Sequence, residues 1–281
     1  MEKMKDLAYY NGTITPINEM MIPANDRGFY FGDGIYEAGM VYHRKIFALQ
    51  DHLDRMFNSA AMLRIELPYT KEEIGALLSE LVDKVESDSQ FLYWQVTRGT
   101  APRNHLFPKD APSNLYVYAK PWPGVQMSDS YRVITVEDTR FFHCNIKTIN
   151  LIPNVMAAQK AQEAGCNEAV FVRDGMVTEG SHCNISIIKD GVFITHPLDN
   201  LILPGTERKH MLAYCEALKI PVEERAFTPA EMMAADEIIM SSTSHPSMRV
   251  MEVDKTPVGM KDPGLVKKLR DMYMEDIEKL R

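Results

Sequence analysis

Three two-residue turn sequences divide much of the chain into β-hairpins. Asn11-Gly12, Asp174-Gly175 and Asp190-Gly191 each stand between short segments rich in β-branched and aromatic residues. These dipeptides tolerate the positive φ angles of tight hairpin turns, and strands joined by two residues run antiparallel. The sequence therefore predicts sheets that are largely antiparallel or mixed.

Helical periodicity appears between the predicted strands. In residues 51–67 apolar side chains recur every three or four positions, and Thr70 with Glu73 forms a capping-box pattern at the start of a second helix. Further helices are expected at residues 154–164, 206–218, 229–234 and 263–280. Hairpin strands combined with separate helices indicate the α+β class.

The segment "PWPGVQ", residues 121–126, interrupts both kinds of periodicity with two prolines and a glycine. A chain of 281 residues is long enough for two domains of ordinary size. We therefore expect a small N-terminal α/β domain at 1–120, a linker at 121–126 and a larger C-terminal domain at 127–281.

Charge and composition narrow the classes of partner. The net charge of −8 leaves no excess of Lys and Arg to neutralise phosphates, which argues against binding to nucleic acid. No apolar run approaches the roughly 18 residues that span a bilayer. The cysteines lack Cys-x-x-Cys spacing and the N-terminus lacks an apolar signal core, so reduced thiols in a cytoplasmic protein are expected. Small molecules are the favoured ligands.

Several familiar active-site motifs are missing. After Gly32-Asp33-Gly34, Glu37 replaces the third glycine of a dinucleotide fingerprint, and this segment opens a predicted strand. There is no phosphate loop ending in Gly-Lys-Ser/Thr, no His-Glu-x-x-His zinc motif and no Gly-x-Ser-x-Gly elbow. Nucleotide, metal and serine-hydrolase functions lose support accordingly.

Lys147 stands in the apolar stretch "HCNIKTINLI", residues 143–152, which reads as a buried strand. An arbitrary lysine in such a strand would usually point outward. A buried one, however, is disfavoured in its charged form, and its neutral amine can condense with an aldehyde. If that aldehyde were pyridoxal phosphate, the chain would also need a carboxylate for the pyridine nitrogen, an anion pocket and a substrate clamp.

Five segments together resemble a known family. They are "DRGFYFGDGIYE" (26–37), "HLDR" (52–55), "NIKTINLIPNVMAAQKAQEAG" (145–165), "EAVFVRDGMVTEGSHCN" (168–184) and "LILPGTERKHML" (201–212). In this order they are similar to the two-domain fold-type-IV pyridoxal-phosphate enzymes, which include D-amino acid aminotransferases, branched-chain aminotransferases and aminodeoxychorismate lyases. The resemblance implies that Lys147 forms the internal aldimine and acts as general acid and base, while Glu179 bonds the pyridine nitrogen.

The same resemblance implies the remaining cofactor contacts. Arg55 could pair with the phosphate; the simpler interpretation is an ordinary charged residue on the surface. Thr206 and Glu207 follow Gly205 at a predicted helix start, where free N–H groups suit an anion. Ser242 and Thr243 would add hydroxyl donors, and the resemblance implies that Leu203 packs against the cofactor ring.

Substrate recognition is assigned to a basic loop. Arg103 and His105 are two residues apart, so in an extended loop they face the same way and could hold one carboxylate. This Arg-x-His is similar to the α-carboxylate trap of D-amino acid aminotransferases, completed by the Tyr36 hydroxyl. In that group the loop reaches the neighbouring site, which implies a homodimer. Arg98 is a rival that closes a strand and is expected to be structural.

Three positions in two segments depart from the pattern of the family. Glu207 lies in "GTERK", where Gly-Ile-Thr-Arg is common, and His182 and Cys183 replace small hydroxyl residues in "EGSHCN". A charge beside a phosphate would alter the anion pocket, and larger side chains near Glu179 would alter the range of substrates.

The sequence thus favours a pyridoxal-phosphate aminotransferase acting on D-amino acids such as D-alanine and D-glutamate, with 2-oxo acids as acceptors and a ping-pong mechanism through a pyridoxamine form. A branched-chain L-aminotransferase or an (R)-amine aminotransferase remains an alternative, as does aminodeoxychorismate lyase. A non-catalytic protein that binds vitamin B6 phosphate is disfavoured, because mere binding requires neither the Lys147 base nor the Glu179 carboxylate.

Overall fold

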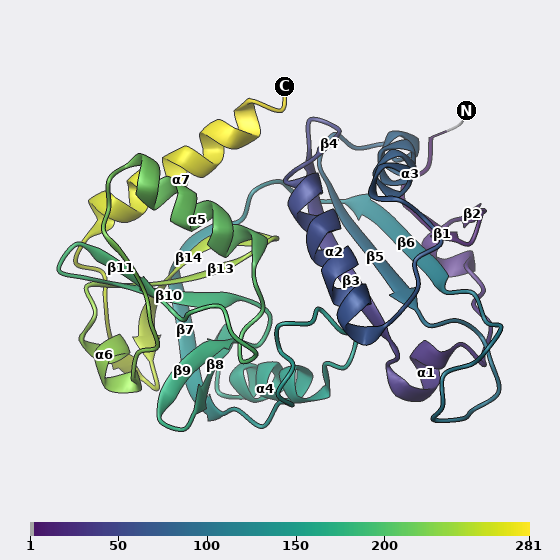
Figure 1. The fold of residues 1–281 in the computed structure, drawn as a ribbon. Coiled ribbons are helices and arrows are strands. Elements are labelled where there is room, and N and C mark those ends of the chain that lie inside the picture. The colour runs from purple at the N-terminus through teal and green to yellow at the C-terminus, as the bar shows by residue number, and fades with distance from the viewer. Residues whose placement is uncertain (1–2) are drawn as a thin grey trace. The chain divides into compact units, whose positions relative to one another are not determined.

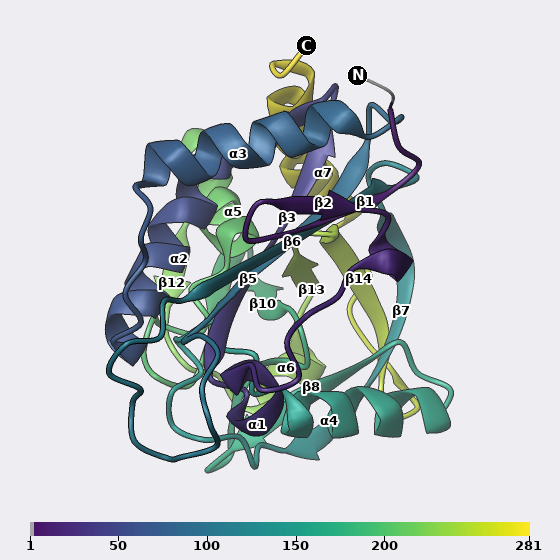
Figure 2. The same ribbon diagram turned by 90° about the vertical axis from the view of Figure 1, so that its right-hand side faces the viewer.

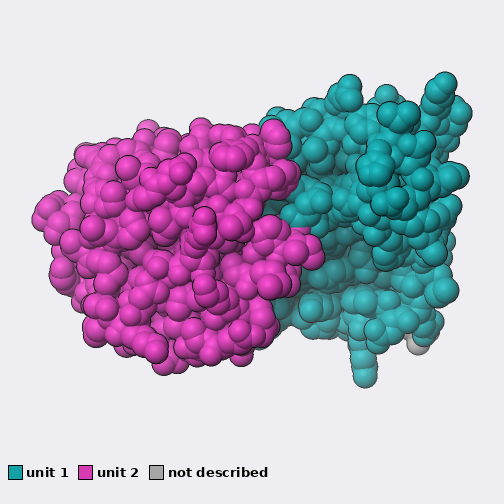
Figure 3. Space-filling view, turned by 90° about the horizontal axis from the view of Figure 1, so that it is seen from below, with its two compact units in different colours: residues 1–124, 146–150, 280–281 teal, residues 125–145, 151–279 magenta. Residues whose placement is uncertain are grey.

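The computed structural model describes residues 3–281, which form two compact units. Unit 1 contains the chain up to Gly124 together with Ile146–Asn150 and Leu280–Arg281, and unit 2 contains Val125–Asn145 and Leu151–Lys279. Figure 3 colours unit 1 teal and unit 2 magenta. Residues 146–150 therefore group with unit 1, whereas the sequence placed Lys147 in the C-terminal domain.

Unit 1 is built on an antiparallel six-stranded sheet of order β2-β1-β6-β5-β3-β4. Its elements are β1 Leu7–Tyr10, β2 Thr13–Thr15, a 3-10 turn Ile17–Glu19, α1 Arg27–Phe31, β3 Gly34–Tyr42, β4 Lys45–Ile46, α2 Leu49–Leu63, α3 Lys71–Lys84, β5 Gln90–Thr97 and β6 Asn114–Pro121. The Asn11-Gly12 hairpin and the Thr70–Glu73 capping box are both confirmed.

Alternation along the strands divides this sheet into two faces. In β5, Leu92, Trp94 and Val96 are buried and pack with the apolar residues of α2 and α3. Figure 1 shows α2 lying along this sheet. Tyr93 points to the other face, where its ring stacks on those of Tyr36 and Tyr118 with centroids 5.6 and 5.0 Å apart. One face is thus an aliphatic core and the other carries tyrosines.

Unit 2 is built on a mixed nine-stranded sheet of order β12-β11-β10-β13-β14-β7-β8-β9, with β15 paired to β14. Its elements are β7 Met127–Glu137, α4 Ile152–Glu163, β8 Glu168–Arg173, β9 Met176–Gly180, β10 Asn184–Lys189, β11 Val192–Thr195, α5 Thr206–Ala217, β12 Val222–Glu224, α6 Pro229–Ala234, β13 Glu237–Ser242, β14 His245–Val253, β15 Thr256–Pro257 and α7 Pro263–Glu278. The two Asp-Gly turns close the β8–β9 and β10–β11 hairpins, as predicted.

Helices cover this sheet at separate places. Helix α5 packs on β13 and α7, and α4 packs on β7 and β8, beside which it runs in Figure 2. A continuous apolar core joins the buried side chains of β10, β13 and β14 to Phe227 and Met232. None of the helices among residues 3–281 has the length and apolar character needed to cross a membrane.

The prediction of a strand at residues 143–152 is wrong. This segment is irregular and makes only one β-bridge, between Thr148 and Ile35. Its main chain instead bonds the edge of β3: the Tyr36 N–H donates to the Lys147 carbonyl at 2.9 Å, and the Ile149 N–H donates to Gly34 at 3.1 Å. The apolar residues reflect burial, since Ile146 joins the core of unit 1 without belonging to a sheet.

Removal of the α3 cap should destabilise unit 1 measurably. The Thr70 side chain accepts from the Glu73 N–H at 3.2 Å, and the Glu73 carboxylate accepts from the Thr70 N–H at 2.7 Å. We expect Thr70→Ala to lower the free energy of unfolding by about 1 kcal/mol, as measured by urea denaturation. Thr70→Ser retains the hydroxyl and serves as control; equal losses in both variants would contradict the capping role.

Candidate active site

Lys147 is held by its main chain on two sides. Its N–H donates to the Ser59 Oγ of α2 at 3.2 Å, and its carbonyl accepts from Tyr36 of β3. The half-buried side chain carries Nζ 4.2 Å from the centroid of the Tyr36 ring. An ammonium group over an aromatic face is attracted by the ring quadrupole. Within unit 1 the structure thus brings together two of the predicted site residues, Lys147 and Tyr36.

Arg55 is buried in an ion pair that the sequence did not reveal. Its Nε and Nη2 donate to the two carboxylate oxygens of Glu37 at 2.8 and 2.7 Å, and the His52 Nδ1 lies 2.8 Å from the same carboxylate. Alternation in β3 directs Glu37 toward α2, while Tyr36 takes the opposite face. Arg55 therefore lies inside the protein, and Glu37 fixes the direction of its guanidinium.

Within the trio of Glu37, His52 and Arg55, burial and the neighbouring charges shift the pKa values of Glu37 and His52. Burial alone would raise the pKa of Glu37, but the charge and hydrogen bonds of Arg55, with a contribution from His52, lower it to about 2. Burial lowers the pKa of His52 against the opposing effect of Glu37. An ionised Glu37, a neutral His52 and a charged Arg55 leave the trio without net charge near neutral pH.

The predicted substrate loop approaches α1. Arg103 lies over the Phe31 ring at 5.1 Å, and the His105 ring lies 5.2 Å from the same ring. Between them the Asn104 carbonyl accepts a 2.6 Å hydrogen bond from Arg27. Arg103 and His105 are thus gathered around one aromatic side chain, and Arg27, which sequence reasoning missed, anchors the loop.

Arg98 has the structural role expected for it. Its Nε donates to Asp33, and its Nη1 and Nη2 donate to the carbonyls of Arg64 and Leu63 at 2.8 and 2.9 Å. These bonds tie the end of β5 to the end of α2. Arg98 is therefore engaged inside unit 1, unlike the exposed Arg103.

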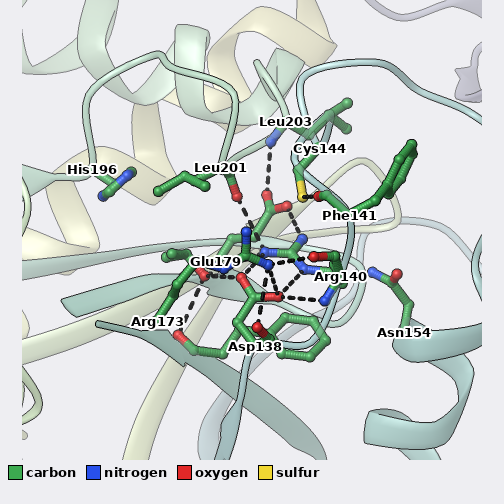
Figure 4. A network of polar contacts seen from close by, with 12 residues as sticks. Asp138, Arg140, Phe141, Cys144, Asn154, Arg173, Glu179, His196, Leu201 and Leu203 are labelled. Atoms are coloured by element: carbon green, nitrogen blue, oxygen red, sulfur yellow. Dashed lines mark hydrogen bonds and ion pairs between the residues drawn. The ribbon is translucent and has the colours of Figure 1, made fainter. Parts of the chain in front are cut away.

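In unit 2, Glu179 is buried at the end of β9 and bonded through both of its oxygens (Figure 4). Oε1 pairs with Arg140, and Oε2 accepts from Asn184 Nδ2 at 3.1 Å and from the Leu203 N–H at 3.0 Å. Burial raises the pKa of Glu179 to about 7, against the lowering effect of Arg140 and of the Leu203 amide. This carboxyl can hold or release a proton near neutral pH.

The start of α5 adjoins Glu179 through Leu203. Gly205 is the N-cap and contributes no side-chain cap to the first turn of the helix. A Cβ at Gly205 would collide with the Asn184 side chain, whose Nδ2 donates to the Leu203 carbonyl at 3.0 Å. Glycine therefore leaves the bonds of Asn184 intact, and no side chain of the N-cap residue covers the first turn of α5.

Hydroxyl groups lie close to this helix start. Thr206 Oγ1 is 3.5 Å from Thr243 Oγ1, which lies in the turn after β13. Ser242 ends β13, and its Oγ is buried with no hydrogen-bond partner among residues 3–281. A buried hydroxyl without a partner is costly unless a ligand satisfies it. Within unit 2 the structure thus gathers Thr206, Ser242 and Thr243 as candidate donors to an anion.

Glu207, His182 and Cys183, which depart from the family's pattern, each have a defined environment in unit 2. Glu207 is buried in α5, and its charge adds to burial and to Asp276 in raising the pKa of Tyr214. His182, whose side chain is 56% exposed, pairs through Nδ1 with the buried Glu168 at 2.6 Å. The Cys183 thiol faces the same carboxylate at 3.7 Å. His182 and Cys183 thus share Glu168 as a partner.

The sequence analysis did not identify four residues that bond the predicted site residues or their partners. They are Glu37 and His52 beside Arg55, and Asp138 and Arg140 beside Glu179. Charged residues inside strand patterns, such as Glu37 in "GIYEAGMVY", were the available signal. Arg140 is harder to find, because it lies in the irregular segment after β7. Its partner Glu179 is 39 residues away along the chain.

Comparison with known proteins identifies the family of the chain. Residues 34–253 match the family model for amino-transferase class IV. The D-alanine aminotransferase of Bacillus licheniformis is 38% identical over 257 residues, covering 91% of each chain. That of Staphylococcus aureus strain MSSA476 is 38% identical over 282 residues, covering 99% of this chain and 98% of that protein.

Solved structures of aminotransferases share the fold. The branched-chain aminotransferase of the thermophilic archaeon Thermoproteus uzoniensis, solved with norvaline, superposes with a TM-score of 0.88 at 25% identity, covering 97% of this chain and 95% of that one. The Escherichia coli branched-chain enzyme has a TM-score of 0.85 at 21% identity, covering 96% and 94%, which is a likeness of fold alone. The chain therefore belongs to the amino-transferase class IV family and is a transaminase with the fold-type-IV α+β architecture.

Proposed function

We propose that this chain transfers amino groups from D-amino acids, such as D-alanine and D-glutamate, to 2-oxo acids, using pyridoxal phosphate. The observation that carries the proposal is the placement of Lys147, whose main chain is bonded on both sides and whose amine lies against Tyr36. The preference for D-amino acids rests on relatives named D-alanine aminotransferase at 38% identity and on the Arg103/His105 loop.

The donor and acceptor groups of the chain fit this cofactor. Glu179 offers a buried carboxylate for a pyridine N–H, and Ser242 offers a buried hydroxyl that lacks a partner among residues 3–281. We infer that Arg55, Thr206, the first-turn N–H of Glu207, Ser242 and Thr243 bind the phosphate, and that Leu203 packs on the ring. When bound, pyridoxal phosphate supplies an electron sink for the bond broken at the substrate Cα.

Each residue then has a defined task. Lys147 would hold the cofactor through Nζ, and its amine would serve as the general acid and base that moves a proton at the substrate Cα. Glu179 keeps the proton on the pyridine nitrogen. Glu37 orients Arg55, since Arg55 donates to both oxygens of Glu37. The two half-reactions would follow each other in a ping-pong sequence.

Arg103, His105 and the Tyr36 hydroxyl are proposed to bind the substrate α-carboxylate. Arg103 and His105 converge on Phe31, so their cationic and donor groups can act on one anion. We further propose a homodimer in which this loop serves the neighbouring site.

A second candidate substrate class is supported by a structural neighbour, the branched-chain aminotransferase of Thermoproteus uzoniensis. Transamination of L-leucine or of an (R)-amine would fit the same cofactor residues. Aminodeoxychorismate lyase activity is a further alternative, recognised by pyruvate release without an amino acceptor. A panel of D- and L-amino acids with 2-oxoglutarate distinguishes these reactions, and preference for L-leucine over D-alanine would reject the D-amino acid proposal.

Replacement of Lys147 should abolish turnover. We expect Lys147→Ala to lower the rate of pyruvate formation from D-alanine and 2-oxoglutarate at least about 10²–10⁴-fold, because the proton-transfer group is lost. Borohydride reduction followed by peptide mass analysis should label Lys147 in the parent protein. The exposed Lys160 provides the matched control Lys160→Ala. Retained turnover in Lys147→Ala, or a label on another lysine, would refute the assignment.

Loss of the Arg103 guanidinium should weaken recognition of the substrate carboxylate. For Arg103→Met we expect kcat/KM with D-alanine to fall about tenfold or more, the range for a lost hydrogen bond to a charged group. Binding of pyridoxal phosphate should be unchanged. Lys109→Ala, an exposed lysine of the same loop, should leave both quantities unaltered. Equal kcat/KM in Arg103→Met and the parent protein would remove Arg103 from the substrate site.

A further inference from the structure

A chain of alternating charges extends from Glu179 into the interior of unit 2 (Figure 4). Arg140 pairs with Glu179 through Nη1 and with Asp138 through Nε and Nη2, at 2.9 and 2.8 Å. Arg173 pairs with Asp138 at 2.9 Å through Nη2. All four residues are at least nine-tenths buried, so their charges interact strongly and are little screened by solvent.

Besides its ion pairs, the Arg140 guanidinium makes further contacts that fix its direction. Nη2 also donates to the Leu201 carbonyl at 3.1 Å and to Thr178 Oγ1 at 3.3 Å. The guanidinium lies 4.3 Å from the centroid of the Phe171 ring. A planar guanidinium loses several of these bonds if it turns away, because its donors have a fixed geometry. Its Nη1 is therefore directed at Glu179 Oε1, which leaves Oε2 to Asn184 and Leu203.

Asp138 and Arg140 act on the charge of Glu179 in opposite directions. Burial raises the pKa of Glu179, Arg140 lowers it, and Asp138 raises it. Burial also raises the pKa values of the Cys144 and Cys183 thiols, so both stay protonated near neutral pH. Arg140 is thus the cation that opposes the effect of burial on the pKa of Glu179, and Asp138 weakens that opposition.

We propose that Arg140, anchored by Asp138, is a positioning residue that sets both the orientation and the ionisation of Glu179 toward the pyridine nitrogen of pyridoxal phosphate. This role rests on the proposed function only in naming the group that Glu179 meets. Arg140 does not itself contact the cofactor. It acts through Glu179, because an ionised carboxylate is a stronger acceptor for a pyridinium N–H than a protonated carboxyl.

The test compares the full-length chain with Arg140→Gln, Arg140→Lys and Asp138→Asn. The titration of the Glu179 carboxyl is followed by carbon-13 NMR in the cofactor-free protein, with Glu179→Gln for assignment. The dissociation constant for pyridoxal phosphate is measured separately by fluorescence. Arg249→Gln is the matched control, since Arg249 forms a similar buried pair with Glu237 in the same unit, at 3.0 and 2.7 Å.

We expect Arg140→Gln to raise the pKa of Glu179, because a lowering charge is removed, and to weaken pyridoxal phosphate binding about tenfold or more. Asp138→Asn should lower that pKa, because a raising charge is removed. Arg140→Lys keeps the charge but not the fork geometry, so the pKa should rise less than in Arg140→Gln while binding stays weakened. Arg249→Gln should leave the Glu179 titration unchanged.

Two results would overturn the proposal. One is an unchanged Glu179 titration in Arg140→Gln, and the other is binding of pyridoxal phosphate by Arg140→Gln no weaker than by Arg249→Gln. If the parent protein fails to bind pyridoxal phosphate at Lys147, the proposed function is refuted instead. The carboxyl titration in the cofactor-free chain would then still decide whether Arg140 controls Glu179. Should Arg140→Gln not fold, Arg140→Lys and Asp138→Asn decide both points.

Discussion

The hydrogen bonds between residues 147–149 and the edge of β3 determine where the Lys147 amine lies. Residues Gly34–Tyr36 pair with β5 on one side, and on the other they accept and donate bonds to Lys147 and Ile149. Because β4 pairs only with Val41 and Tyr42, this part of the edge is open to the incoming segment. An irregular segment can therefore place Lys147 firmly without forming a strand of its own.

Two buried carboxylates show how the surroundings set opposite ionisation behaviour. Glu37 and Glu179 each pair with an arginine, yet the pKa of Glu37 is lowered to about 2 and that of Glu179 is raised to about 7. Arg55 donates twice to Glu37, with His52 in addition, whereas Arg140 gives Glu179 one nitrogen and shares its charge with Asp138. Because Arg140 divides its positive charge between two carboxylates, it lowers the pKa of Glu179 by less than burial raises it.

Much of the fold was predictable because its signals are local. The Asn-Gly and Asp-Gly turns, the Thr70 capping box and the helical stripe of α3 each depend on residues within a few positions of one another. The strand expected at residues 143–152 was wrong for the same reason. Apolar residues around Lys147 record burial, and local pattern alone does not distinguish a buried irregular segment from a strand.

The sequence by itself determined the hairpins, most helices, the family motifs and the identity of Lys147 and Glu179 as candidates. Only the tertiary structure decided which charges meet. Arg55 meets Glu37 across 18 positions and Arg140 meets Glu179 across 39, and neither separation follows a helix or strand period. Charge compensation of buried groups depends on three-dimensional distance and solvent exclusion, quantities that only the folded chain defines.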